Sequence, residues 1–191
     1  MIIVKQFKRL NANQKVINKN RLLENRMEAK ELLETNQYLA FNLDKEVFAF
    51  DISKVREVLE FVEVTKVPQT PDMMKGVINL RGSVVPVVDV RIKFGMGETE
   101  KTVNTVIIII EIDLDGTSTM IGALVDSVQE VIDLDSEHIE PPPQIGTKLN
   151  TDFIRGMGKQ DGKFLIILDI EKIFSSEELD FVEQASEQVP V

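Results

Sequence analysis

The segment Gly76-Val-Ile-Asn-Leu-Arg-Gly-Ser-Val-Val-Pro-Val-Val-Asp-Val90 decides the fold. Its apolar runs, 78–80 and 84–90, lie on either side of Arg81-Gly82, which predicts a β-hairpin. The same pattern returns 156 − 76 = 80 residues later. At that spacing the chain repeats Thr70-Pro-Asp-Met-Met-Lys-Gly76 as Asn150-Thr-Asp-Phe-Ile-Arg-Gly156, Gly82 as Gly162, Asp89 as Asp169, and Phe94 as Phe174. The sequence therefore contains an internal duplication.

A second pair of segments supports the duplication. Val55-Arg-Glu-Val58 matches Val128-Gln-Glu-Val131 at a spacing of 128 − 55 = 73 residues. The difference between the spacings, 80 − 73 = 7, fits an insertion around residues 140–146. Two similar small β-barrels packed side by side would bury more apolar surface than either could alone, and closed barrels leave few exposed sheet edges.

The remaining pattern is also predominantly β. Residues 38–50 predict strand, tight turn and strand, and the alternation over 60–67 predicts a strand that stops at Pro68. Residues 103–125 predict a hairpin around Asp115-Gly116, and 163–170 predict a buried strand. Ser175 and Glu178 form a capping box that predicts a short helix from Ser176 to about Ala185. The predicted class is all-β with a short C-terminal helix, preceded by a disordered or partly helical extension over residues 1–36.

Composition excludes several classes of function. The chain has 191 residues, 22 basic and 32 acidic, for a net charge of −10. Residues 1–26 hold seven basic residues and one acid, +6, so the remainder is −16 and repels phosphate backbones, which argues against nucleic-acid binding by the core. There is no cysteine for thiolate or zinc–sulfur chemistry, and His138 is the single histidine. The longest apolar run, 106–110, is too short to span a bilayer, so we expect a cytoplasmic protein without direct membrane insertion.

No constellation of residues predicts a catalytic centre, a metal site or a cofactor. Asp113-Leu-Asp115-Gly116 has a fragment of calcium-loop spacing but lacks the later oxygen ligands, which favours a hairpin turn. A small carboxylate-dependent enzyme or a metal-binding protein remains an alternative, because 32 acids make paired carboxylates easy to find.

Matched positions of the repeat predict structural roles, and mismatched positions predict function. Gly76 and Gly156 are expected to end helical turns opened by Thr70 and Asn150. Arg81 matches Asp161 and Asn79 matches Lys159, and because Arg-Gly is not a favoured turn pair, turn chemistry does not explain Arg81. An arginine at a hairpin tip offers five donors to a carboxylate or carbonyl cluster on another chain, although a solvated surface arginine is an equal alternative.

The repeated valine segments predict a docking surface. If Val55, Val58, Val128 and Val131 face one another across the seam between the barrels, they line an apolar groove suited to an amphipathic helix. The alternative is that each valine is simply part of the core.

Several motifs together resemble one family. Gly76–Gly82, Val85–Phe94, Gly122–Asp126, Val128–Val131 and Ile170–Phe174 closely resemble the bacterial chemotaxis coupling family CheW, and the resemblance covers about residues 37–184. The same domain type occurs in the histidine kinase CheA and in CheV. The resemblance implies two five-stranded, SH3-like β-barrels around a shared hydrophobic core. We expect subdomains over about 37–103 and 104–175, and a helix and tail over 176–191.

The resemblance also implies a function. Members of this family are non-enzymatic adaptors that bridge the cytoplasmic tip of methyl-accepting chemotaxis receptors to the regulatory domain of CheA, and so reach membrane receptor arrays through their partners. A CheV-like adaptor without its receiver domain is the nearer alternative. The partner-sensitive positions of the family carry over, and the repeat adds Val58 and Asn79. The candidate receptor- and kinase-binding residues are Val55, Glu57, Val58, Gly76, Asn79, Arg81, Gly122, Val128 and Val131.

Overall fold

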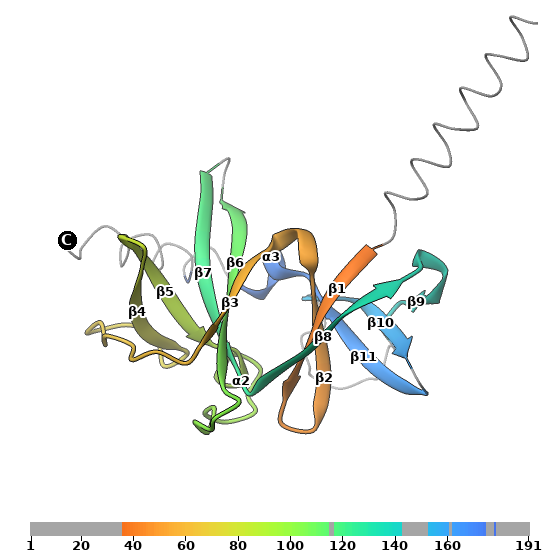
Figure 1. The fold of residues 1–191 in the computed structure, drawn as a ribbon, viewed down its shortest axis with the longest axis horizontal. Coiled ribbons are helices and arrows are strands. Elements are labelled where there is room, and N and C mark those ends of the chain that lie inside the picture. The colour runs from red at the N-terminus through yellow and green to blue at the C-terminus, as the bar shows by residue number, and fades with distance from the viewer. Residues whose placement is uncertain (1–35, 115–116, 143–152, 161, 175–177, 179–191) are drawn as a thin grey trace, which may run out of the picture. The chain divides into compact units, whose positions relative to one another are not determined.

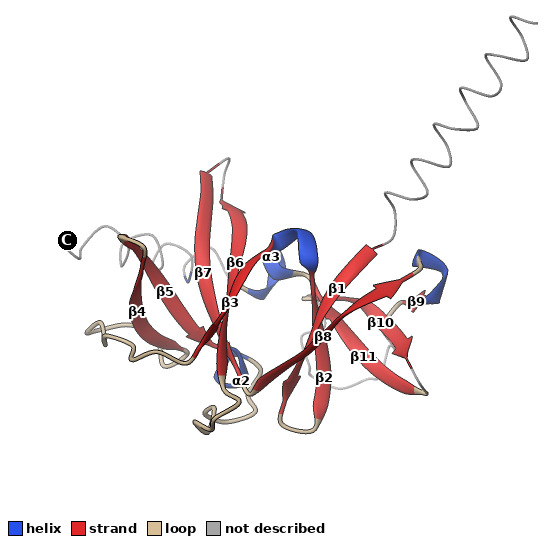
Figure 2. Ribbon diagram, in the orientation of Figure 1, coloured by secondary structure: helices blue, strands red, loops and turns tan. Residues whose placement is uncertain are grey.

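The protein is an all-β molecule with two sheets and a few single-turn helices (Figures 1 and 2). The computed structural model describes residues 36–114, 117–142, 153–160, 162–174 and 178. The predicted helix over 176–185 and the extension over 1–35 lie outside these residues. In the described part of the chain, no helix is long and apolar enough to cross a membrane.

Sheet B is built from consecutive strands and has the order β3-β6-β7-β5-β4. Its β4–β5 hairpin is the one predicted around Arg81-Gly82, and β5 pairs with β7 in parallel. The strands are β3 (Val55–Glu60), β4 (Met74–Leu80), β5 (Ser83–Asp89), β6 (Val106–Leu114) and β7 (Thr117–Val125).

Sheet A joins the first described strands to the last ones, in the order β8-β1-β2-β11-β10-β9. The strands are β1 (Asn36–Leu43), β2 (Glu46–Asp51), β8 (Ser127–Leu134), β9 (Ile139–Glu140), β10 (Ile154–Gln160) and β11 (Lys163–Leu168). The short helices are η1 (Ile52–Lys54), α2 (Val90–Lys93), η2 (Ser136–His138) and α3 (Ile170–Ile173).

The order of strands confirms the duplication. The strands that match in sequence, β4 with β10 and β5 with β11, hold equivalent places in the two sheets. Both hairpins also shift register at the same point, between Met74 and Gly76 and between Ile154 and Gly156. The bridge between Thr65 and Val77 has its counterpart in the pairing of Glu140 with Met157. Sheet A therefore has a sixth strand only because this contact extends to the two residues of β9, whereas sheet B has the expected five strands.

The expected subdomain boundaries at 37–103 and 104–175 are wrong. The β1–β2 hairpin belongs to the sheet of the C-terminal strands, because β2 pairs in parallel with β11 through Phe48–Ile166 and Ala49–Ile167. A parallel pair requires a long crossover between its strands, and here the whole of sheet B lies within that crossover. The chain passes from sheet A to sheet B at η1, and it returns to sheet A after β7.

Two local expectations are also wrong. β3 ends at Glu60, and residues 61–67, which we call the strap, make a single bridge to β4 instead of the predicted strand. Gly76 and Gly156 lie inside β4 and β10 rather than at the ends of helical turns. The strap explains the glycine of the first repeat, because it crosses β4 beside Gly76 and leaves no room there for a Cβ.

The two sheets share a hydrophobic core, as expected. One buried cluster contains Phe41 and Phe50 from sheet A together with Ile108 and Ile110 from sheet B. Two smaller clusters belong to one sheet each, around Ile167 and around Ile107. A polar contact also joins the sheets, since the backbone amide of Asp44 donates to the Asp126 carboxylate with an N–O distance of 2.6 Å.

Candidate functional site

Arg81 occupies a strained position at the tip of the β4–β5 hairpin. Leu80 and Ser83 are paired, so Arg81 and Gly82 form a two-residue turn with φ angles of 54° and 93°. Both angles are positive, as in the type I′ turn that favours Asn-Gly. A side chain in this left-handed region costs about 1–2 kcal/mol. Asn79 supports the turn, because its Oδ1 accepts from the Gly82 amide at 2.8 Å.

The Arg81 side chain forms an exposed ion pair with Glu57. The guanidinium Nη2 lies 2.9 Å from Glu57 Oε2, and the two side chains are 79% and 25% exposed. The pair links the hairpin tip to β3. An ion pair this exposed contributes about 0–1 kcal/mol to stability, which does not exceed the cost of the turn. The arginine therefore has no evident structural benefit, and it presents most of its donors to solvent.

The four repeated valines divide into two kinds. Val55 on β3 and Val128 on β8 are half-buried and both pack against the shared core, although they come from different sheets. Val58 is 41% exposed and Val131 is 47% exposed. The valines are thus neither sealed in separate cores nor uniformly exposed. The groove that all four were predicted to line stays a prediction.

Gly76 and Gly122 are buried positions where packing requires the absence of a side chain. A Cβ at Gly76 would lie 2.0 Å from the Thr65 carbonyl oxygen of the strap, and the φ angle there is 134°. A Cβ at Gly122, on β7, would lie 2.8 Å from Ile107 Cγ2. The structure therefore gives both glycines a packing role, and their part in partner binding stays a prediction.

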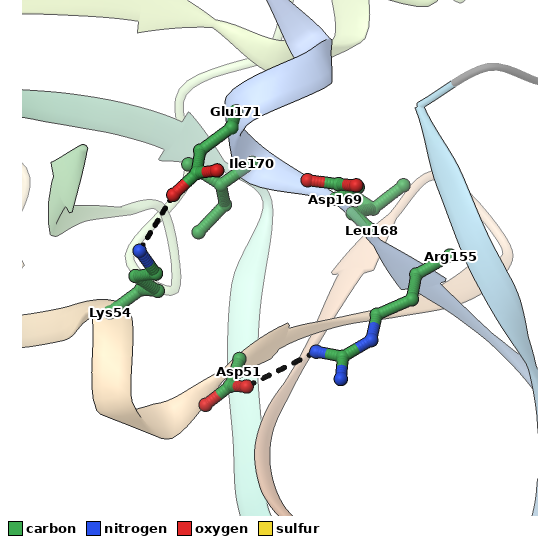
Figure 3. A pocket seen from close by; sticks show the side chains of 7 residues that line it. All are labelled: Asp51, Lys54, Arg155, Leu168, Asp169, Ile170 and Glu171. Atoms are coloured by element: carbon green, nitrogen blue, oxygen red, sulfur yellow. Dashed lines mark hydrogen bonds and ion pairs between the residues drawn. The ribbon is translucent and has the colours of Figure 1, made fainter. Parts of the chain in front are cut away.

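A charged pocket, which the sequence analysis did not predict, lies where the chain first passes from one sheet to the other. Its cavity of about 190 Å³ is lined by two apolar residues and by charged residues from the end of β2, from η1, from β10, and from α3 with its N-cap (Figure 3). Lys54 Nζ lies 2.7 Å from Glu171 Oε1, and Arg155 Nη1 lies 3.3 Å from Asp51 Oδ2. The lining residues are Asp51, Lys54, Arg155, Leu168, Asp169, Ile170 and Glu171. Lys54 and Glu171 are 117 residues apart in sequence, so no local motif could have indicated this pocket.

The surroundings of Asp51 in this pocket lower the pKa of its carboxyl group. Burial alone would raise the pKa of Asp51, but hydrogen bonds from Ser53 and the nearby Arg155 outweigh it and lower that pKa below 3.8. Outside this pocket, a hydrogen bond from Lys75 lowers the pKa of Glu98 below 4.5. A general acid at neutral pH needs a raised carboxyl pKa instead. Among the described residues, no three of His, Cys, Asp or Glu gather closely enough to hold a metal ion.

A second pocket, under the strap, was also missed. It has a volume of about 370 Å³ and combines an apolar floor with a rim of lysines. Its lining residues are Phe61, Glu63, Val64, Lys66, Lys75, Lys101 and Leu124. The signal in the sequence was weak, because the lysines are dispersed over three segments that only the folded chain brings together.

The fold and these surfaces define a small β scaffold with an exposed arginine-tipped hairpin beside a shared core. The family model for the CheW-like domain matches residues 37–178. The chain is 38% identical over 150 residues to the chemotaxis protein CheW of Klebsiella aerogenes, which covers 78% of this chain and 88% of that protein. It is 33% identical over 142 residues to CheW of Rhizobium meliloti, and this match covers 74% of this chain and 89% of that protein.

A solved structure agrees with these matches. The scaffolding protein TtCheW from Thermoanaerobacter tengcongensis aligns with a TM-score of 0.67 and 39% identity, over 75% of this chain and 95% of that one. The chain belongs to the CheW-like family of chemotaxis scaffold proteins. Because the matched CheW proteins are covered over nearly their whole length, the CheV-like alternative is not favoured.

Proposed function

We propose that this protein couples methyl-accepting chemotaxis receptors to the regulatory domain of the kinase CheA, through a surface centred on Arg81 and Glu57. The observation that carries the proposal is the strained, exposed arginine. Its turn would be more stable with Asn or Gly, and its ion pair is too exposed to offset the cost. Strain kept at an exposed position supports a functional role for the side chain.

The surroundings of Arg81 support docking rather than chemistry. Val58 follows Glu57 on β3 and is 41% exposed, but successive side chains of a strand point to opposite faces, so Val58 lies on the other face from the charged pair. Leu59, two residues after Glu57, shares its face and is half-buried, so this side chain supplies the apolar surface next to the pair. An interface centre with an arginine and an apolar neighbour, bordered by polar groups, is typical of binding hot spots. Val131 on β8 offers a second exposed valine on the other sheet. We assign Val55, Val128, Gly76, Asn79 and Gly122 to the support of this surface.

The role we propose is non-enzymatic, and the protein acts in the cytoplasm, recruited to receptor arrays by its partners. The match to a scaffolding protein, over 95% of that protein's length, supports this view.

The test separates binding from folding. Arg81→Asn removes the guanidinium but suits the left-handed turn, so stability should stay equal or rise by up to about 1 kcal/mol. Affinity for a receptor-tip fragment or for the CheA regulatory domain, measured by titration calorimetry, should fall about tenfold, or ~1.4 kcal/mol. The control is Arg56→Gln, which removes the same charge from the neighbouring ion pair with Glu111. Unchanged binding of both partners to Arg81→Asn would remove Arg81 from the site.

A further inference from the structure

The pocket under the strap is held open by the backbone. The Thr65 amide donates to the Val77 carbonyl at 2.9 Å, and the Val77 amide donates to the Thr65 carbonyl at 2.8 Å. These two bonds fix the strap across β4, and Gly76 allows the close approach. The cavity of about 370 Å³ lies within the range of ligand-sized pockets and belongs to the folded framework.

The floor of this pocket is apolar. Phe61 and Val64 of the strap pack against the buried cluster of sheet B, and Leu124 of β7 is part of that cluster and 3% exposed. The floor is therefore a hydrophobic surface that the core of sheet B supports from below. An apolar side chain entering here would be removed from water without any rearrangement of the sheet.

The rim of the pocket is basic, in contrast to a chain with a net charge of −10. Its lining holds three lysines and one acid, 3 − 1 = +2, and the lysines are Lys66, Lys75 and Lys101. Lys101 Nζ lies over the ring of Phe61, 4.0 Å from its centre, so this ammonium group stands directly against one of the apolar residues of the pocket. Lys75 pairs with Glu98, and this lysine, with a further contribution from Lys66, lowers the pKa of that carboxyl.

We infer that this pocket is a docking site for an acidic–apolar segment of a partner protein: one apolar side chain enters the cavity, and flanking carboxylates pair with Lys66 and Lys101. The positive charge of the rim favours a partner segment with negative charge. The apolar floor requires that this segment also carry an apolar side chain. This goes beyond the Arg81 surface, because no residue of the pocket belongs to it.

The test uses the full chain, labelled with ¹⁵N, and a short capped peptide with one leucine between two pairs of glutamates. Saturable shifts should appear at the amides of Phe61, Val64 and Leu124. Replacing the glutamates by glutamines, or the leucine by alanine, should weaken binding at least tenfold. The double variant Lys66→Glu with Lys101→Glu should do the same, whereas the matched control, Lys45→Glu with Lys163→Glu, changes two exposed lysines outside the pocket and should bind normally.

Three results would overturn the inference. Shifts that map outside the pocket would show that the peptide binds elsewhere. Equal binding of the glutamine peptide, or of octanoate alone, would show that the site does not select an acidic–apolar protein segment. A concentration-dependent dimer that occludes these amides, seen by analytical ultracentrifugation, would show that a second copy of the chain covers the pocket. Arg81→Asn should leave peptide binding unchanged, so failure here and failure of the proposed function are distinguishable.

Discussion

Gly76→Ala should destabilise the protein far more than the same change at Gly82, although both glycines have positive φ angles. At Gly82, with φ at 93°, a Cβ meets nothing within 4 Å, so only the backbone cost of about 1–2 kcal/mol applies. At Gly76, with φ at 134°, the Cβ would in addition lie 2.0 Å from the Thr65 oxygen. That overlap cannot be relieved by rotating a side chain, because the obstacle is backbone.

The extra cost at Gly76 follows from what must move. The strap has to leave β4, which breaks the two hydrogen bonds between Thr65 and Val77 at about 1 kcal/mol each. We therefore expect Gly76→Ala to lower the free energy of unfolding by about 3–4 kcal/mol, and Gly82→Ala by about 1–2 kcal/mol.

Urea denaturation followed by circular dichroism measures both variants, with unchanged m-values required for the comparison. Amide hydrogen exchange supplies a local readout, since the Thr65 and Val77 amides should lose protection in Gly76→Ala alone. Equal destabilisation of the two variants, within about 0.5 kcal/mol, would refute the role assigned to the strap, as would unchanged protection of those two amides.

Four further substitutions test the framework. Gly122→Ala should cost about 1–3 kcal/mol by overpacking against Ile107, seen as a lower Tm; no loss would mean that the strands move apart freely. Asp89→Ala should cost about 2–3 kcal/mol in urea denaturation, because its buried carboxylate caps α2 through the amides of residues 91 and 92 and also accepts from residue 99. Asp169→Ala, at the equivalent place before α3, should cost below about 1 kcal/mol, since its side chain makes no cap hydrogen bond; equal costs would contradict this account. Asp51 has a lowered pKa in the folded state, chiefly because it accepts hydrogen bonds from Ser53 and also because Arg155 is near. Its contribution to stability is therefore present above pH ~4 and is lost as the pH falls through the folded pKa. Asp51→Asn should flatten the acid limb of a pH–stability curve, and a parallel curve would argue against these stabilising contacts of the carboxylate.

The sequence predicted what is encoded locally or by repetition. The β4–β5 hairpin and the two similar sheets followed from apolar periodicity and from the spacings of 80 and 73 residues, whereas the shared core followed from the family resemblance. Arg81 followed from a mismatch between turn chemistry and repeat position, and the structure shows the strained turn that this mismatch implies.

What the sequence could not predict depends on contacts between distant segments. β1 and β2 belong to the sheet of β11 because β2 pairs with β11 in parallel. No local sequence pattern indicates this pairing, because it depends on the whole crossover between the two strands. The strap resembles a strand in its apolar alternation, yet one close approach at Gly76 determines its path. The lysine-rimmed pocket needs Lys66, Lys75 and Lys101 to converge, which only the fold achieves.

Co-sedimentation of the purified chain with membranes that carry receptor and with CheA tests the coupling role most directly. We predict that CheA enters the pellet with the receptor when this protein is present, and that substitution by Arg81→Asn greatly reduces the pelleted kinase while the Arg56→Gln control does not. Pelleting of CheA to the same extent without this protein, or equally with the Arg81→Asn chain, would contradict the account.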